Sequence, residues 1–287
     1  AGNIDELSID VAAAQLAAAA RKGRSLTATL RATPPPTDPD APVFLTVSGG
    51  LSRLVDALVT AIREKGGEVR TGATVDQLAR DGKGYRVGGV EAEGIVLAVP
   101  AGAAATLIGD HAPGASTTLA AVRYASVALA TMAFPEGAVD RPLDASGYLV
   151  PRPSGLTMTA CTWADRKWAH LRRPGQVLLR ASAGRVDNRD ADLDDEALVA
   201  RLRSDLATTM GLRGEPSAVR VHRWPSSFPQ YAPGHLDRMA AAHRELAERL
   251  PGVGLAGAAL SGVGIPACIG SGQAAARIAS GRDNAPS

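Results

Sequence analysis

The residues VGLAGAALSGVGIPACIGSGQAA, numbers 253–275, indicate the fold class of this 287-residue chain. Their apolar start predicts a buried strand, their glycines a tight turn, and Pro266 the first turn of a helix. A helix that begins after such a turn presents free N–H groups and a positive dipole end, which stabilise negative charge. The alternative is a turn whose glycines serve packing alone. Either way, the order of strand, turn and helix predicts an α/β unit.

Elements of the same kind occur earlier in the chain. We predict a helix around residues 8–21, a proline-rich boundary at 33–42, a strand at 43–47, an amphipathic helix at 51–65, a strand at 68–75, a hairpin with turns at 81–82 and 88–89, a strand at 94–100 and a helix at 236–250. The segment GIVLAVP at 94–100 is continuously apolar, which predicts a strand buried on both faces. These elements belong with the α/β unit at 253–275.

The middle of the chain has a different pattern. The segments SVALATMAF, SGYLVP, LTMTACTW and QVLLRASAG predict antiparallel strands, residues 195–206 predict a helix, and the residues after Trp224 predict a loop. The fold class is therefore mixed α/β and α+β. We expect a discontinuous α/β domain and, inserted into it, a second domain built on a large, mainly antiparallel sheet.

Composition excludes several functions. A net charge of +2 and an aromatic content of 3% leave no basic stripe and few stacking rings for nucleic acid. Cys161 and Cys268 lie far apart and the histidines form no HExxH motif, so we predict no disulfide framework and no metal site. No apolar run approaches the roughly 20 residues that span a bilayer. The acidic start AGNIDELSID is unlike a signal peptide, and we expect a cytoplasmic protein.

Nucleotide motifs are weak. The chain has no GxxxxGK[ST] loop and no GxSxG elbow. GVGIPA at 262–267 matches GxGxxG/A formally, but a dinucleotide fingerprint also needs a following strand and an acidic residue about 20 positions on. We do not expect this turn to be the main phosphate loop of a cofactor.

Four longer segments carry a family resemblance. They are FLTVSGGLSRLVDAL (44–58), TACTWADRKWAH (159–170), RWPSSFPQYAPGHLDR (223–238) and LAGAALSGVGIPACIGSGQAA (255–275). Together they resemble the protoporphyrinogen/coproporphyrinogen oxidase family of flavin amine oxidase-like proteins, most closely its bacterial coproporphyrinogen III oxidases. The resemblance implies the end of a helical, membrane-associating domain at 1–40, FAD-domain segments at 41–105 and 225–287, and a substrate-binding domain at 106–224.

The resemblance also implies cofactor contacts. Val75 corresponds to a backbone contact with the adenine of FAD, and Trp224 to a contact with the flavin. The flavin segment implied at the carboxy-terminal turn comprises Ala258, Val263, Gly264 and Ile265. A side chain at position 264 would intrude on the flavin, with added backbone strain if the turn needs a positive φ there. For Val75 the alternative is a buried strand valine, and for Trp224 it is a core or boundary tryptophan.

Substrate contacts follow in the same way. Leu149, Thr162 and Ala183 correspond to pocket positions, while Arg180 and Lys167 are candidates to bind propionate groups through charge-assisted hydrogen bonds. Core packing is the alternative for Leu149 and Ala183, and a solvated surface charge for Arg180 and Lys167.

The implied activity is the oxidation of coproporphyrinogen III to coproporphyrin III in haem biosynthesis, with FAD, dioxygen as acceptor and hydrogen peroxide as product. No general acid or base stands out, which suits hydride transfer to a flavin. Protoporphyrinogen IX is the alternative substrate. The same residues also suit a flavin oxidase of the amine oxidase or carotenoid desaturase type, or a non-catalytic fragment without FAD. The resemblance implies no transmembrane span and allows peripheral membrane contact.

One departure from the family pattern yields a test. The family begins with a βαβ unit that carries GxGxxG and a ribose-binding acid, and no segment here matches it. A further segment or a partner chain would have to supply that unit. We therefore expect the 287-residue chain by itself to bind FAD weakly or not at all, as measured by flavin absorbance after gel filtration with added FAD. A stoichiometric yellow complex would contradict this expectation.

Overall fold

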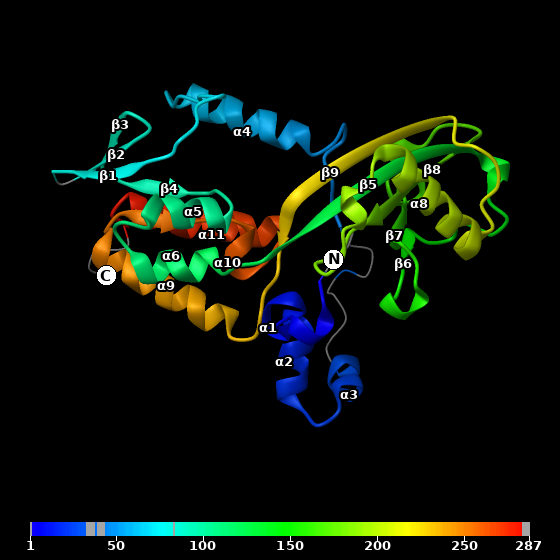
Figure 1. Cartoon of the computed structure of the whole chain (residues 1–287), viewed down its shortest axis with the longest axis horizontal. Helices are drawn as coiled ribbons and strands as arrows, with labels where there is room; N and C mark the ends of the chain where they lie inside the picture. The colour runs from blue at the N-terminus through cyan, green and yellow to red at the C-terminus, as the bar shows by residue number, and fades with distance from the viewer. Residues whose placement is uncertain (1, 33–37, 39–43, 83, 283–287) are drawn as a thin grey trace. The chain divides into compact units, whose positions relative to one another are not determined.

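The computed structural model of the chain describes residues 2–32, 38, 44–82 and 84–282. It divides into two compact units, one formed by Ile9–Glu93 and the other by Ala1–Ser8 with Gly94–Ser287 (Figure 1). The four segments implied by the family resemblance, 1–40, 41–105, 106–224 and 225–287, remain a prediction. The predicted boundary at 33–42 lies outside the described residues except for Asp38, as does Val43.

The unit Ile9–Glu93 contains helices and a small sheet. Its elements are α1 (Ile9–Ala12), α2 (Ala14–Lys22), α3 (Leu26–Arg31), α4 (Ser52–Glu64), β1 (Leu78–Asp81), β2 (Gly84–Val87) and β3 (Val90–Ala92). The predicted helix at 8–21 is broken because the backbone of Ala13 has φ −148° and ψ 58°. α4 confirms the helix predicted at 51–65. The predicted hairpin is confirmed and extended by β3 into an antiparallel sheet of order β1-β2-β3.

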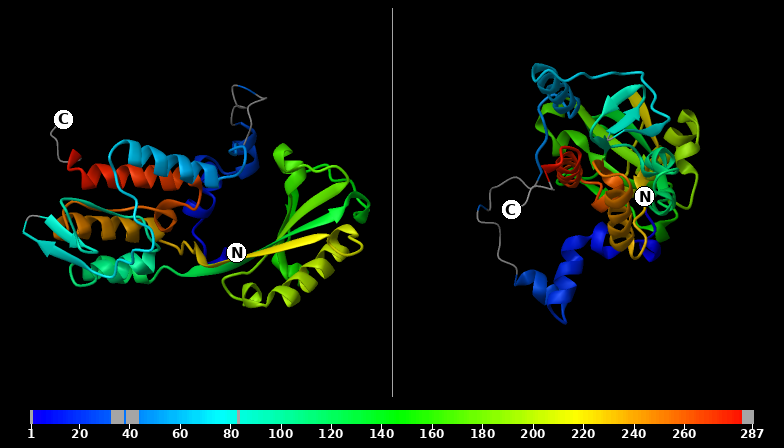
Figure 2. Two further views of the ribbon diagram at one scale, coloured as in Figure 1. Left: turned by 90° about the horizontal axis from the view of Figure 1, so that it is seen from above. Right: turned by 90° about the vertical axis from the view of Figure 1, so that its left-hand side faces the viewer.

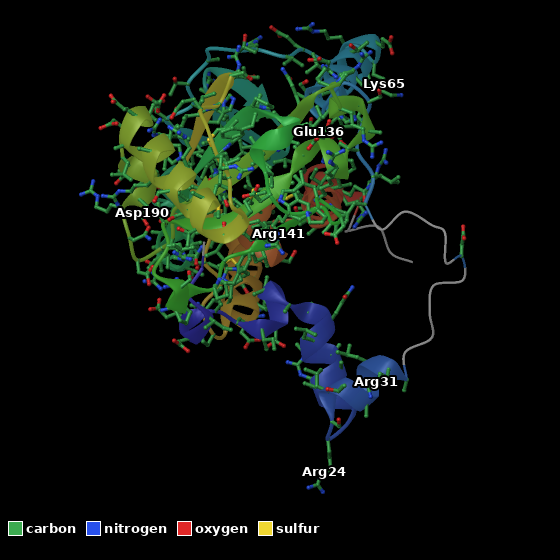
Figure 3. All side chains as sticks on the ribbon, turned by 90° about the vertical axis from the view of Figure 1, so that its right-hand side faces the viewer. Arg24, Arg31, Lys65, Glu136, Arg141 and Asp190 are labelled. Atoms are coloured by element: carbon green, nitrogen blue, oxygen red, sulfur yellow. The ribbon has the colours of Figure 1, made fainter. Side chains whose placement is uncertain are left out.

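Two predicted strands of this unit are wrong. Residues 44–47 and 68–75 form no strand, because no described segment pairs with them. A β-rich sequence becomes a strand only when a neighbour accepts its hydrogen bonds. This unit carries exposed basic side chains, among them Arg24, in the turn between α2 and α3, and Arg31, at the end of α3 (Figure 3). No helix in the described part of the chain is both long and apolar enough to span a membrane.

The other unit is built on a five-stranded antiparallel sheet of order β6-β7-β8-β5-β9. Its strands are β5 (Tyr124–Pro135), β6 (Gly147–Leu149), β7 (Met158–Trp163), β8 (Gln176–Ala183) and β9 (Ala218–Pro229). Four of them confirm the predicted antiparallel strands. The loop predicted at 225–235 is wrong for residues 225–229, because β9 continues along β5 to Pro229, and it is confirmed for residues 230–234 (Figure 1). At a bulge, Pro225, Ser226 and Ser227 of β9 lie opposite the single residue Ser126 of β5.

One face of this sheet is covered by α8 (Asp195–Met210), as Figure 2 shows. The helix begins at Asp194, whose carboxylate accepts a hydrogen bond from the Ala197 amide, and ends at Gly211 with φ 67°. Alternate strand residues and one side of the helix form a fully buried core: Met132, Phe134, Met158, Val177, Leu179, Leu198, Leu202 and Leu206. Because α8 covers this face of the sheet, the opposite face is the one available to a ligand.

The second part of this unit is the α/β part. Its elements are β4 (Ile95–Leu97), α5 (Ala101–Ile108), α6 (Pro113–Ala120), α9 (His235–Arg249), β10 (Val253–Leu255), α10 (Ala258–Ser261) and α11 (Ile265–Ala279). β4 and β10 are parallel, as an α/β domain requires. Val96 is 40% exposed, so the prediction of a strand buried on both faces is wrong. The sheet has two described strands here; β10 is buried along its length, whereas in β4 only Ile95 and Leu97 are buried.

Short 3₁₀ helices complete this unit. They are η1 (Ile4–Glu6), η2 (Glu136–Ala138), η3 (Arg152–Ser154), η4 (Ala169–Leu171) and η5 (Asp190–Asp192), and a short α-helix, α7 (Ala164–Lys167), follows β7.

Two aromatic side chains fix the position of α10. The Tyr231 hydroxyl donates a hydrogen bond of 2.5 Å to the Ala258 oxygen. Nε2 of His235 lies 2.9 Å from the Ala259 oxygen and 3.0 Å from the Leu260 oxygen. Because both of these neighbours are acceptors, Nε2 carries the hydrogen. The two rings pack edge to face at 4.9 Å, and we call this pair the Tyr–His clamp.

Burial favours the neutral forms of both clamp residues. It raises the pKa of the Tyr231 hydroxyl, and it lowers the pKa of His235 below the ordinary value of 6.5 despite the two carbonyl contacts. As the pH falls below the ordinary pKa of histidine, His235 takes up a proton in the unfolded chain but remains neutral in the folded one. Proton binding then stabilises the unfolded state, and the free energy of unfolding decreases.

The clamp therefore predicts an acid-sensitive stability. The contribution of His235 should be complete above about pH 6.5 and should decline as the pH falls toward the lowered pKa of the folded state, by at most about 1.4 kcal/mol per pH unit. His235→Gln keeps a donor for the carbonyls but does not titrate. The loss of unfolding free energy between about pH 7.5 and about pH 5.5, measured by urea denaturation, should be smaller in this variant than in the wild type.

Two features sharpen this test. Burial also lowers the pKa of His243, so the variant should retain part of the pH dependence. His170→Gln replaces an exposed histidine and serves as the matched control. The same pH dependence in the wild type and in His235→Gln would show that the clamp histidine is not the titrating group.

Candidate functional site

The carboxy-terminal turn is shaped by two glycines. Gly257 has φ 117° and ψ −177°, and Gly262 has φ 155°, conformations that side-chain-bearing residues rarely adopt. The strand predicted for VGLAGAAL therefore ends at Leu255, and the chain turns into α10. Gly264 has an ordinary backbone with φ −67° and ψ 143°, so the positive φ considered there belongs to Gly262. A Cβ atom at Gly264 would meet only Pro266 Cδ, at 3.8 Å.

The residues implied for the flavin segment come together at this turn. Ala258 is the first residue of α10, Gly264 precedes α11, and Ile265 begins it. No side chain caps the first turn of α11, so its N–H groups are left for another partner. The side chains of Val263 and Ile265 are 46% and 47% exposed. The turn thus offers a small apolar surface beside a positive helix end, which fits a flat, electron-rich ring.

The Tyr–His clamp is a site feature that sequence reasoning missed. Tyr231 and His235 both lie in the segment RWPSSFPQYAPGHLDR, but the spacing of the histidines indicates only solvated or capping roles. Their hydrogen bonds hold the backbone of α10 between the two special glycines. A tyrosine four residues before a histidine is the signal that could have suggested a paired role.

Trp224 lies on β9, opposite Val127 of β5, and its side chain is 55% exposed. Because side chains alternate along a strand, Arg220, His222 and Trp224 share one face of β9. Just beyond Trp224, Ser226 adopts a left-handed conformation with φ 44°, and its amide donates a hydrogen bond to Ser126 Oγ. The bulge at this point interrupts the regular pairing, which resumes at Phe228, and the exposed indole remains available to a ligand.

The implied substrate residues lie on both faces of the sheet. Thr162 pairs with Arg180 across β7 and β8, and Leu149 pairs with Ala160 across β6 and β7, which places all three implied residues on the face opposite α8. We call this surface the open face. Leu149 is 83% exposed there.

The remaining implied residues lie elsewhere. Ala183 is fully buried in the core on the α8 side, so the structure does not bring it together with Arg180. Lys167 lies at the end of α7, with Nζ 5.4 Å from the centroid of the Trp168 ring. Val75 belongs to the unit Ile9–Glu93, lies outside any strand and is partly exposed.

Several curated porphyrinogen oxidases are similar in sequence to this chain. It is 34% identical over 287 aligned positions to the coproporphyrinogen III oxidase of Bacillus subtilis, covering 96% of this chain and 60% of that protein. It is 35% identical to the coproporphyrinogen III oxidase of Mycobacterium bovis, covering 94% of this chain and 58% of that protein. The match to human protoporphyrinogen oxidase is 30% over 79% of this chain and 50% of that protein. The chain thus spans about three fifths of the bacterial relatives.

Structural comparison agrees. A solved structure of a proposed protoporphyrinogen oxidase from Exiguobacterium superposes with a TM-score of 0.82 at 30% identity, covering 99% of this chain and 61% of that one. A reduced UDP-galactopyranose mutase shares the fold alone, with a TM-score of 0.65 at 14% identity. The family model described as flavin-containing amine oxidoreductase matches residues 1–279. The chain belongs to the flavin-containing amine oxidoreductase family, with porphyrinogen oxidases among its relatives.

Proposed function

We propose that this chain serves the FAD-dependent oxidation of coproporphyrinogen III to coproporphyrin III, with dioxygen as acceptor and hydrogen peroxide as product. The observation that supports it best is the open face of the sheet, where Arg180 and Thr162 lie side by side on a surface that also carries exposed apolar side chains. Such a surface suits a flat, apolar ring system that carries carboxylates. The bacterial relatives that align with 94–96% of the chain carry this activity in their names.

The cofactor would be FAD, held at the carboxy-terminal turn. Val263, Gly264 and Ile265 would line its ring, the uncapped N–H groups of α11 would face its polar edge, and Ala258 would approach through α10. Trp224 would pack against the same ring system and Val75 would contact the adenine. When bound, FAD supplies the hydride acceptor and passes the electrons to dioxygen.

The chain's own residues would bind and orient the substrate. Arg180 would form a charge-assisted, bidentate contact with a propionate, with Thr162 as a hydrogen-bonding neighbour and Leu149 against the ring. Lys167 is a second candidate for a propionate. Ala183 lies in the core, so its contribution to the site would be indirect. Its small side chain would allow β8 to pack closely against α8. Each two-electron step would remove a hydride from a carbon atom and a proton from a pyrrole nitrogen of the substrate, and none of these residues is assigned to accept that proton.

Protoporphyrinogen IX is the second candidate substrate, favoured by the match to the human enzyme. Coproporphyrinogen III carries four carboxylates and protoporphyrinogen IX carries two. A contact from Arg180 to a carboxylate that only the first substrate has would discriminate between them. We also propose that the dinucleotide-binding βαβ unit comes from a further segment or a partner chain, and that the enzyme works in the cytoplasm, either free or in peripheral contact with a membrane.

The test is turnover by the chain combined with that βαβ unit and FAD. Porphyrin fluorescence should rise in air with coproporphyrinogen III, together with hydrogen peroxide. Arg180→Ala should lower kcat/KM about tenfold for the tetracarboxylate and less for protoporphyrinogen IX. Arg189→Ala removes an arginine whose side chain is 90% exposed and paired with Asp192, and should leave both values unchanged.

Two results would count against the proposal. Porphyrin formation no faster than without enzyme would remove the proposed activity. An equal loss for both substrates in Arg180→Ala would show that Arg180 does not discriminate between the tetracarboxylate and the dicarboxylate, while leaving the activity in place.

A further inference from the structure

We propose that Arg220, which the family resemblance did not single out, acts with Arg180 as a pair of guanidinium groups that binds two carboxylates of one macrocycle. This inference rests on the proposed function and specifies how the substrate is recognised. It adds a specificity-determining residue on β9 to the site.

The strand register places the two arginines in one row. Thr131 of β5 pairs with Arg180 of β8 on one side and with Arg220 of β9 on the other. Arg180 in turn pairs with Thr162 of β7. Directly paired residues point to the same side of a sheet, so the row lies on the open face. Two strand spacings separate the backbones of Arg180 and Arg220, or about 10 Å.

The charge of the open face is unbalanced. None of the strands β5 to β9 contains an aspartate or a glutamate. Both arginines are exposed, and neither forms an ion pair with any described residue. Arg223, three residues along β9, provides the contrast. It lies on the α8 side, where it bonds to the Asp195 carboxylate and the Leu193 oxygen.

The neighbouring row of paired residues supplies apolar side chains to the open face. Leu129 of β5 pairs with Ser182 of β8 and with His222 of β9, and Ala160 of β7 pairs with Leu149 of β6. Trp224 lies two positions beyond His222 on the same face of β9, about 13 Å from Arg220 at the usual rise per residue. A flat ring system placed along β9 would therefore meet Trp224 at one end and the arginine pair at the other.

The chemistry of the pair selects for a rigid polycarboxylate. Each guanidinium offers a planar fork of N–H donors that matches a carboxylate, which an ammonium cannot reproduce. A macrocycle with a propionate on every pyrrole ring can reach both arginines at once. A ligand without free carboxylates leaves both unpaired and gains only apolar contact.

The experiment measures binding of coproporphyrin III to the full 287-residue chain by fluorescence titration, without flavin. Arg220→Ala should weaken binding about tenfold, and the double variant with Arg180→Ala about a hundredfold. Arg220→Lys should restore only part of the affinity. Arg189→Ala is the control for loss of one positive charge and should bind like the wild type. The tetramethyl ester of coproporphyrin III should bind weakly and equally to every variant.

The inference is overturned if Arg220→Ala binds coproporphyrin III like Arg189→Ala, or if the ester loses affinity to the same degree. It is also overturned if the wild-type chain does not prefer the free acid over its ester. Circular dichroism of each variant excludes misfolding as the cause of a loss. These outcomes are separate from turnover: arginine-dependent binding without oxidation would contradict the proposed function alone.

Discussion

The antiparallel pairing of β5 with β9 is the constraint on which the rest of this structure depends. The ladder runs from Tyr124 and Pro229 at one end to Ala133 and Ala218 at the other. β5 also pairs with β8, so it fixes the rest of the sheet and the face that α8 covers. A shift of one residue in β9 would turn Arg220 and Trp224 toward the core side. The register of this one ladder therefore decides which side chains form the open face.

The same ladder connects the sheet with the carboxy-terminal turn. β9 leaves the sheet after Pro229, and within the next six residues the chain brings Tyr231 and His235 to the carbonyls of α10. The two halves of the candidate site are thus joined by a short, tightly bonded segment. Tyr231 and His235 are not among the residues proposed to contact FAD or substrate, yet their hydrogen bonds hold α10 in position.

Sequence alone predicted much of this fold. Alternating apolar residues indicated the strands of the large sheet, and the helical period and acidic start indicated α8. Pro225 and its serine neighbours suggested a loop, because local signals do not show that β5 is available to pair. The same limit applies to the site. Alternation along β8 places Ala183 and Arg180 on opposite faces, but the sequence does not show which face α8 covers. An isolated arginine such as Arg220 gains significance only through its register beside Thr131.

The long separation along the chain between β5 and β9 has a consequence for folding. Thr131 and Arg220 are paired neighbours, yet they lie in strands separated by β6, β7, β8 and α8. Contacts between such distant segments are expected to form late, because the chain must lose the conformational entropy of a long loop before the pairing contributes stabilising free energy. We therefore expect β9, an edge strand, to join the sheet late in folding. Until it pairs with β5, Arg220 and Trp224 are not aligned with Arg180, so the open face is incomplete in a partly folded chain.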